Sequence, residues 1–167
     1  MSDVRIREAR QADIACLASL KSDYVRTLYR GLVPPETLRA ATAAEYEPQI
    51  ANWLVTGLYD VTLMERDGKP AAFIVHNEDI TQPGTGLIYE MVCDHLCTMD
   101  EKYLLLDHIL DGMHKQGHSE AHVWILRDNF RARFLVENHD FRIDGTRDVV
   151  LLHGQEYSIA RYTYLFR

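Results

Sequence analysis

The chain has 167 residues, a formal net charge of -7, and a composition that is 47% hydrophobic and 26% charged. These values predict one globular domain over residues 1–167 with a sizeable core, and they exclude a largely disordered chain. The acidic balance argues against nucleic acid or an anionic membrane surface as the main partner, because phosphates and lipid headgroups attract basic proteins.

The three cysteines, Cys16, Cys93 and Cys97, are too few and of odd number for a disulfide framework. No apolar segment typical of a secretory signal follows Met1, and no run of about 18 apolar residues predicts a membrane span. We therefore expect a cytoplasmic protein.

Hydrophobic periodicity divides the chain into strands, where apolar and polar residues alternate, and helices, where apolar residues lie three or four apart. Asp67-Gly68 between two strand-like runs predicts a β-hairpin, and Gly117 ends a helix. The expected elements in chain order are a strand at 4–7, a helix at 12–20 that continues less regularly to 29, a helix at 36–54 interrupted near Pro48, strands at 61–65, 71–76 and 87–93, a helix at 100–115, a strand at 121–126, a helix at 129–138, and strands at 149–153 and 158–166.

The order of these elements predicts the fold class. A strand–helix–strand unit in the middle of the chain implies a parallel strand pair with a right-handed crossover. The flanking hairpins imply antiparallel pairs. We therefore predict an α/β (α+β) fold, with a mixed, mostly antiparallel sheet that has a central parallel strand pair and is flanked by helices.

Four short stretches carry a resemblance to a known family. They are Ile6-Arg7-x-Ala9 with Asp13, Tyr29-Arg30-Gly31-Leu32, the run from Leu126 through Asn129 to Ala132, and Phe141-Arg142-x-Asp144-Gly145. In this order and spacing they resemble the GNAT superfamily of N-acyltransferases over nearly the whole chain. The resemblance implies transfer of an acetyl group from acetyl-CoA to an amine of a small-molecule or peptide acceptor, and it makes a homodimer plausible.

The resemblance also implies where acetyl-CoA binds. Its pantetheine arm lies between the fourth and fifth strands and bonds to backbone, here that of Met91, Val92 and Cys93. Asn129 can bond the same arm, although it suits equally well the N-cap of its own helix.

The loop expected to bind the pyrophosphate departs from the family pattern Arg/Gln-x-x-Gly-x-Gly/Ala. The candidate residues are Thr98, Met99, Asp100, Glu101, Lys102 and Tyr103, and they include no glycine. Thr98-x-x-Glu101 fits a capping box, in which two side chains satisfy the first N–H groups of a helix. We predict that this helix caps itself, which leaves fewer N–H groups for phosphate.

The short helix that follows the fifth strand departs from the pattern too. Many members carry a Tyr four positions after the Ala of this motif, and its hydroxyl can protonate the departing thiolate. Val136 holds that position here, and Asp140 replaces a usual glycine just before Phe141.

Glu90 and Tyr89 are the candidate catalytic residues, because a general base must lie near the acyl carbonyl on the fourth strand. Strand alternation predicts that Glu90 shares one face with Ile88 and Val92, and that Tyr89 lies on the other. A Glu among apolar neighbours can have a raised pKa and accept a proton. An exposed or salt-bridged Glu90 and a core-packed Tyr89 are the alternatives.

Two further groups of residues could bind an acceptor or a metal ion. Tyr24, Tyr46 and Trp53 lie in the segment that shapes the acceptor pocket in the family, and core packing is their alternative. Cys93, His95 and Cys97 are closely spaced, but no second ligand pair at zinc-like spacing accompanies them, so no metal site is predicted.

Two functions of different class follow. The first is an acetyl-CoA-dependent N-acetyltransferase, which the family resemblance favours. The second is a catalytically inactive GNAT-fold binding or regulatory protein, which the glycine-free loop and Val136 favour.

Overall fold

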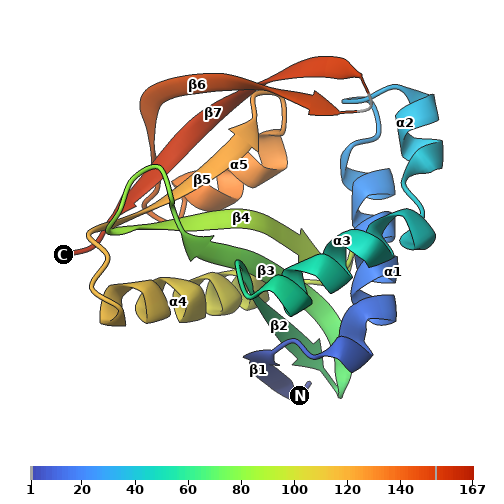
Figure 1. Cartoon of the computed structure of the whole chain (residues 1–167), viewed down its shortest axis with the longest axis horizontal. Helices are drawn as coiled ribbons and strands as arrows, with labels where there is room; N and C mark the ends of the chain where they lie inside the picture. The colour runs from blue at the N-terminus through green and yellow to red at the C-terminus, as the bar shows by residue number, and fades with distance from the viewer. Residues whose placement is uncertain (1, 153) are drawn as a thin grey trace.

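The computed structural model describes residues 2–152 and 154–167. Figure 1 shows the chain coloured from the N-terminus to the C-terminus. The elements in chain order are β1 (Val4–Glu8), the short 3-10 helix η1 (Gln11–Asp13), α1 (Ile14–Leu28), α2 (Pro35–Ala40), α3 (Ala43–Thr56), β2 (Asp60–Arg66), β3 (Lys69–Glu78), β4 (Thr85–Cys93), α4 (Met99–Lys115), β5 (Glu120–Leu126), α5 (Phe130–Glu137), β6 (Arg142–Leu152) and β7 (Gln155–Leu165).

The strands form one sheet with the order β1-β2-β3-β4-β5-β7-β6. Among the strand pairs of the described residues, β4–β5 is the one that is parallel, and α4 makes the connection between these two strands. The other neighbours pair antiparallel. The predicted mixed, mostly antiparallel sheet with a central parallel pair and flanking helices is confirmed.

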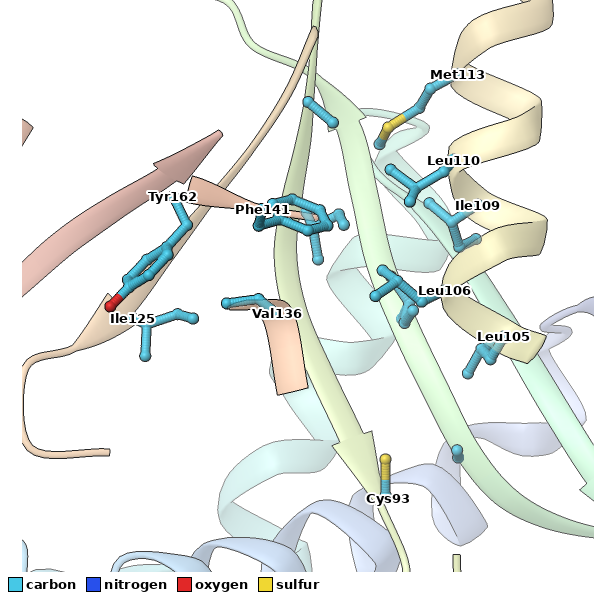
Figure 2. Close-up of a cluster of buried hydrophobic side chains, with 14 of the residues drawn as sticks. Cys93, Leu105, Leu106, Ile109, Leu110, Met113, Ile125, Val136, Phe141 and Tyr162 are labelled. Atoms are coloured by element: carbon cyan, nitrogen blue, oxygen red, sulfur yellow. The ribbon is translucent and has the colours of Figure 1, made fainter. Parts of the chain in front are cut away.

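Helices cover both faces of the sheet, and the sheet separates two hydrophobic cores (Figure 1). On one face α1 and α3 pack on β2, β3 and β4 through residues such as Leu17, Trp53 and Phe73. On the other face α4 packs its Leu105, Leu106, Ile109, Leu110 and Met113 against the sheet, as Figure 2 shows. The helical spacing of these apolar residues is what directs one side of each helix to the sheet.

The prediction of a helix at 36–54 that is interrupted near Pro48 is wrong about the position of the break. The segment is two helices, and α3 starts after Thr42, whose side chain accepts a hydrogen bond from the Glu45 N–H. Pro48 lies inside α3. A threonine that caps a new helix explains a break upstream of the proline.

The strand expected at 149–153 is longer than predicted. β6 begins at Arg142 and pairs with β7 from there, with a register shift between Ile143 and Arg147. Residues 142–148 are mostly polar and exposed, so they lack the alternation that signals a strand. His153, the last residue of the expected strand, lies outside the described residues.

The parallel pair is short, and this feature creates the site. β4 and β5 pair only over Thr85–Ile88 and Glu120–Val123. Beyond Ile88 and Val123 the two strands are no longer paired, although β4 continues to Cys93 and β5 to Leu126. The backbone edge of residues 89–93 therefore faces the gap between the strands. Within the described part of the chain, no helix is long and apolar enough to cross a membrane.

Candidate functional site

The gap between β4 and β5 opens into a cleft of about 1420 Å³. Its lining comes from elements far apart in sequence: α1 and α3 on one side, β4 and β5 at the floor, and the start of α5 with the β6–β7 hairpin on the other side. A cleft of this size suits a large ligand together with a second, smaller one.

A bulge in β4 changes the faces predicted for the candidate catalytic residues. Val75 pairs with Glu90, but the next residue, His76, pairs with Ile88, so Tyr89 is an extra residue on β4. One extra residue reverses the alternation on one side of a bulge. Ile88 consequently packs in the core under α4, and not on the face of Glu90 and Val92 as predicted. Tyr89 also departs from the prediction, because its ring contacts Trp53 and Tyr59 beside α3.

Glu90 lies at the floor of the cleft and forms an ion pair with Lys21 of α1. Each Glu90 carboxylate oxygen lies 2.9 Å from Lys21 Nζ, and Nζ also donates a hydrogen bond of 2.7 Å to Gln49 Oε1 of α3. The salt-bridged alternative for Glu90 is therefore what the structure shows. The Glu90 side chain remains 21% exposed and lines the cleft, so part of this side chain faces the ligand space.

The environment of Glu90 raises the pKa of its carboxyl above the ordinary value of 4.5. Burial is the larger effect, because it disfavours the charged form, and the charge and hydrogen bond of Lys21 oppose it in part. A carboxylate with a raised pKa is a stronger base than a solvated one, and the charge of its partner lysine favours the ionised form.

Aromatic rings surround this ion pair. Trp53, Tyr59 and Tyr89 contact one another, with ring centroids 5.2 to 6.4 Å apart. Tyr24 and Tyr46, two of the three aromatic residues predicted to line the acceptor pocket, line the cleft. The third, Trp53, is 3% exposed and packs in the core. Burial raises the pKa of the Tyr24, Tyr46 and Tyr89 hydroxyls, so these phenols stay protonated and neutral at physiological pH.

The N-terminus of α4 caps itself, which confirms the predicted capping box. Thr98 Oγ1 accepts a hydrogen bond of 3.2 Å from the Glu101 N–H, and Glu101 Oε2 accepts one of 2.9 Å from the Thr98 N–H. The Leu96 N–H also donates within the loop, to Asp94 Oδ1. Three backbone donors of this loop are thus already bonded to the chain's own side chains.

Arg66, at the end of β2, fixes the same loop from the side. Its guanidinium donates to both carboxylate oxygens of Glu101, at 2.8 and 2.7 Å, and to Asp94 Oδ2 at 3.0 Å. The hydrogen bonds from Arg66 lower the pKa of Glu101 to about 2. The carboxylate of Glu101 therefore already accepts hydrogen bonds from Arg66 and from the Thr98 N–H.

The other residues predicted in the loop have mixed positions. Met99 and Lys102 line the cleft, and Lys102 brings a positive charge to it. Asp100 is exposed, and Tyr103 stacks on His139 at 4.8 Å between ring centroids. On β4, the side chains of Met91, Val92 and Cys93 enter the cores, which leaves the backbone of Met91 and Cys93 for a ligand.

The α5 segment holds the two departures noted in the sequence. Asn129 caps the helix, since its Oδ1 accepts the Ala132 N–H at 3.2 Å; its Nδ2 is the atom left to donate to a ligand. Val136 points into the core beside Phe141 (Figure 2), so it reaches no leaving group. Asp140 has φ 65°, the left-handed conformation for which glycine is the usual residue.

Cys93 is buried and Cys97 half-buried. Among the described residues, no group of three or more His, Cys, Asp or Glu side chains is arranged to hold a metal ion.

Sequence reasoning missed Lys21 and Arg66. Their partners lie 69 and 35 residues away in sequence, so no local motif links them. A signal for Lys21 did exist: it lies four residues after Leu17 and four before Val25, on the buried stripe of α1. A lysine on the apolar face of a helix indicates a buried partner. Arg66 carried no comparable signal.

Solved structures with the same topology match nearly the whole chain. A GCN5-related N-acetyltransferase from Rhodopseudomonas palustris superposes with a TM-score of 0.79 at 19% identity, covering 99% of this chain and 98% of that one. The chain has the GNAT fold. The PaiA N-acetyltransferase from Thermoplasma acidophilum, solved in complex with coenzyme A, is another GNAT structure similar to this chain, with a TM-score of 0.73 at 15% identity over 97% and 99% of the two chains.

One curated protein is similar to the chain in sequence. The chain is 22% identical over 147 residues to a probable N-acetyltransferase from Mycobacterium tuberculosis, covering 86% of this chain and 83% of the relative. No protein-family model matches the chain.

Proposed function

We propose that this protein is an N-acetyltransferase that transfers an acetyl group from acetyl-CoA to an amine. The observation that carries the proposal is the position of Glu90, a carboxylate with a raised pKa at the floor of the cleft, beside the edge of β4 that β5 leaves unpaired. The similar proteins support it, since they are named as N-acetyltransferases and one is complexed with coenzyme A.

The residues around the gap fit the pantetheine arm of acetyl-CoA. The backbone of Met91 and Cys93, on either side of Val92, presents N–H and C=O groups to it, as an unpaired strand edge does, whereas the backbone of Val92 faces β3. Asn129 Nδ2 is a further donor on the opposite side. An amide-rich linear chain can satisfy such an edge as a neighbouring strand would.

The phosphates meet a different environment from the one that the family pattern implies. The side chains of Thr98, Glu101 and Asp94 accept hydrogen bonds from three backbone N–H groups of the loop. We therefore assign phosphate binding to two cations that line the cleft, Lys102 from α4 and Arg131 from α5. Charged side chains bind phosphate without needing a glycine-rich backbone.

When bound, acetyl-CoA supplies the acetyl group: the amine nitrogen bonds to the acetyl carbon, the carbon–sulfur bond breaks, and coenzyme A departs as its thiolate. Glu90 takes the proton that the amine gives up, directly or through a water molecule. The N–H groups of β4 stabilise the negative charge that develops on the carbonyl oxygen. Val136 cannot donate a proton, so the thiolate takes its proton from water.

The test is amine-dependent release of coenzyme A. The purified protein is incubated with acetyl-CoA and a panel of primary amines, free thiol is measured, and the acetylated amine is identified by mass spectrometry. We expect thiol and acetylated amine in equal amounts for at least one amine. Absence of both across the panel, with a correctly folded protein, contradicts the proposal.

A further inference from the structure

The surroundings of Lys21 Nζ form a complete binding site for a primary ammonium group. Nζ lies 2.9 Å from the Glu90 carboxylate, 2.7 Å from Gln49 Oε1, 4.6 Å from the centroid of the Tyr46 ring and 5.1 Å from that of Trp53. A carboxylate, an amide oxygen and two aromatic faces are the groups that recognise an alkylammonium ion. The chain's own lysine, only 7% exposed, fills this site.

This site belongs to the wall of the cleft. Lys21, Tyr46, Gln49 and Glu90 all line the cleft, so a ligand bound there meets them. Every ammonium group of a substrate finds this cation position taken and meets the positive charge of Lys21 in surroundings of low polarity, where repulsion is weakly screened. A substrate with two or more ammonium groups is therefore repelled more strongly than a substrate with one. The ion pair itself is neutral overall and attracts a polycation only weakly.

The other carboxylates that line the cleft attract a substrate ammonium group too weakly to offset its repulsion by Lys21. Most already accept hydrogen bonds from the chain: Asp94 from Arg66, Asp79 from Thr81, and Glu78 from the Gly84 N–H. Asp23 and Asp148 lie at exposed positions, where attraction to a cation is screened by solvent.

Four further residues that line the cleft are aromatic and uncharged. Tyr24, Tyr29, Tyr59 and Tyr89 line the cleft next to the ion pair. Burial raises the pKa of Tyr29 to about 12, so its phenol remains neutral, as do those of Tyr24 and Tyr89. Such rings bind flat apolar bodies by edge and face contacts, and their hydroxyls donate hydrogen bonds.

We propose that Lys21 determines acceptor specificity: it occupies the ammonium site between Glu90, Tyr46 and Trp53, so the pocket accepts a monoamine carried on an aromatic body and rejects diamines and polyamines. This inference rests on the proposed function, because it names the acceptor of the same site. It predicts that a variant without Lys21 binds polyamines more tightly than the wild-type protein, because removal of Lys21 empties the ammonium site and leaves its carboxylate and aromatic rings in place.

The experiment measures binding by calorimetry in the absence of acetyl-CoA, with 2-phenylethylamine and spermidine as probes. For the wild-type protein we expect 2-phenylethylamine to bind about tenfold more tightly than spermidine or better. For Lys21→Ala we expect the affinity for spermidine to rise about tenfold or more. Lys115→Ala, which removes an exposed lysine at the far end of α4, serves as the matched control and should leave both affinities unchanged.

Each result decides the inference. Equal or tighter binding of spermidine by the wild-type protein overturns it, as does failure of 2-phenylethylamine to bind, or an unchanged spermidine affinity in the variant. If Lys21→Ala does not fold, Lys21→Met replaces it; this change removes the charge but keeps the apolar stem, and the same direction of change is expected.

A parallel turnover assay with acetyl-CoA separates this inference from the proposed function. Selective binding of 2-phenylethylamine without acetylation of any amine leaves the pocket assignment standing and contradicts the transferase. Acetylation of spermidine in preference to 2-phenylethylamine supports the transferase and overturns the role of Lys21.

Discussion

Two carboxylates near the cleft each pair with a basic residue, yet their pKa values move in opposite directions. At the N-terminus of α4, Glu101 receives two hydrogen bonds from Arg66 and one from the Thr98 N–H, and its pKa falls to about 2. At the floor of the cleft, Glu90 has Lys21 as its one side-chain partner among the described residues, and burial raises its pKa. The number of donors and the loss of solvent decide the direction, and the presence of a basic partner alone does not.

This difference separates a structural region from the region that we propose to be reactive. The α4 N-terminus is a closed network in which Arg66, Asp94, Thr98 and Glu101 satisfy one another. The Lys21–Glu90 region keeps a basic carboxylate open to the ligand space. Changes in the first region should therefore affect stability, and changes in the second should affect catalysis.

The largest effect is expected for Glu90→Gln. The amide keeps the shape of the side chain but cannot accept the proton of the amine, so kcat should fall about 10²–10⁴-fold. The measurement is steady-state release of coenzyme A. Glu36→Gln, an exposed residue of α2 with 74% of its side chain accessible, is the matched control and should retain full activity. An unchanged kcat for Glu90→Gln would show that another group is the base.

Arg66→Met should give the largest loss of stability. It leaves Glu101 and Asp94 without their partner in surroundings that are only 15% and 23% exposed, which should cost roughly 2–3 kcal/mol. Urea unfolding measures the free energy. Arg39→Met removes an exposed ion pair with Glu36 and should cost about 0–0.5 kcal/mol. Equal losses for the two variants would mean that the α4 network does not hold the loop.

Glu101→Gln tests the same network through pH. The folded pKa of about 2 lies below the ordinary 4.5, so the carboxylate stabilises the fold above pH 4.5, and this contribution is lost as pH falls from 4.5 towards 2. The wild-type protein should therefore lose about 1–2 kcal/mol more than Glu101→Gln between pH 6 and pH 3. Parallel pH profiles for the two proteins would contradict the low pKa.

Thr98→Ala should have the smallest effect, about 1 kcal/mol of stability, because it removes one side of the capping box. Thr98→Ser keeps the hydroxyl and should be close to wild type. Thermal unfolding of both variants is sufficient to compare them. A larger effect from the serine variant would point to packing of the threonine methyl group.

The network at the α4 N-terminus was largely predictable from sequence, whereas the surroundings of the Lys21–Glu90 ion pair were not. Thr98-x-x-Glu101 is a local motif, and the fold follows from local periodicity and turns, so both could be predicted. The β4 bulge at Tyr89 has no sequence signature, because it depends on the register with β3, and it moved Ile88 to the opposite face. The partners of Glu90 and Glu101 are Lys21 and Arg66, which only the folded sheet and its helices bring near.

The most direct test of the account is a calorimetric titration of the purified protein with acetyl-CoA and with coenzyme A. Our assignment predicts binding of both at micromolar concentration, with weaker binding by Lys102→Ala and unchanged binding by Lys69→Ala, an exposed lysine of the β2–β3 hairpin. Absence of binding at millimolar ligand would contradict the central claim, because the self-capped α4 N-terminus would then exclude acyl-CoA from a cleft that otherwise has the GNAT geometry.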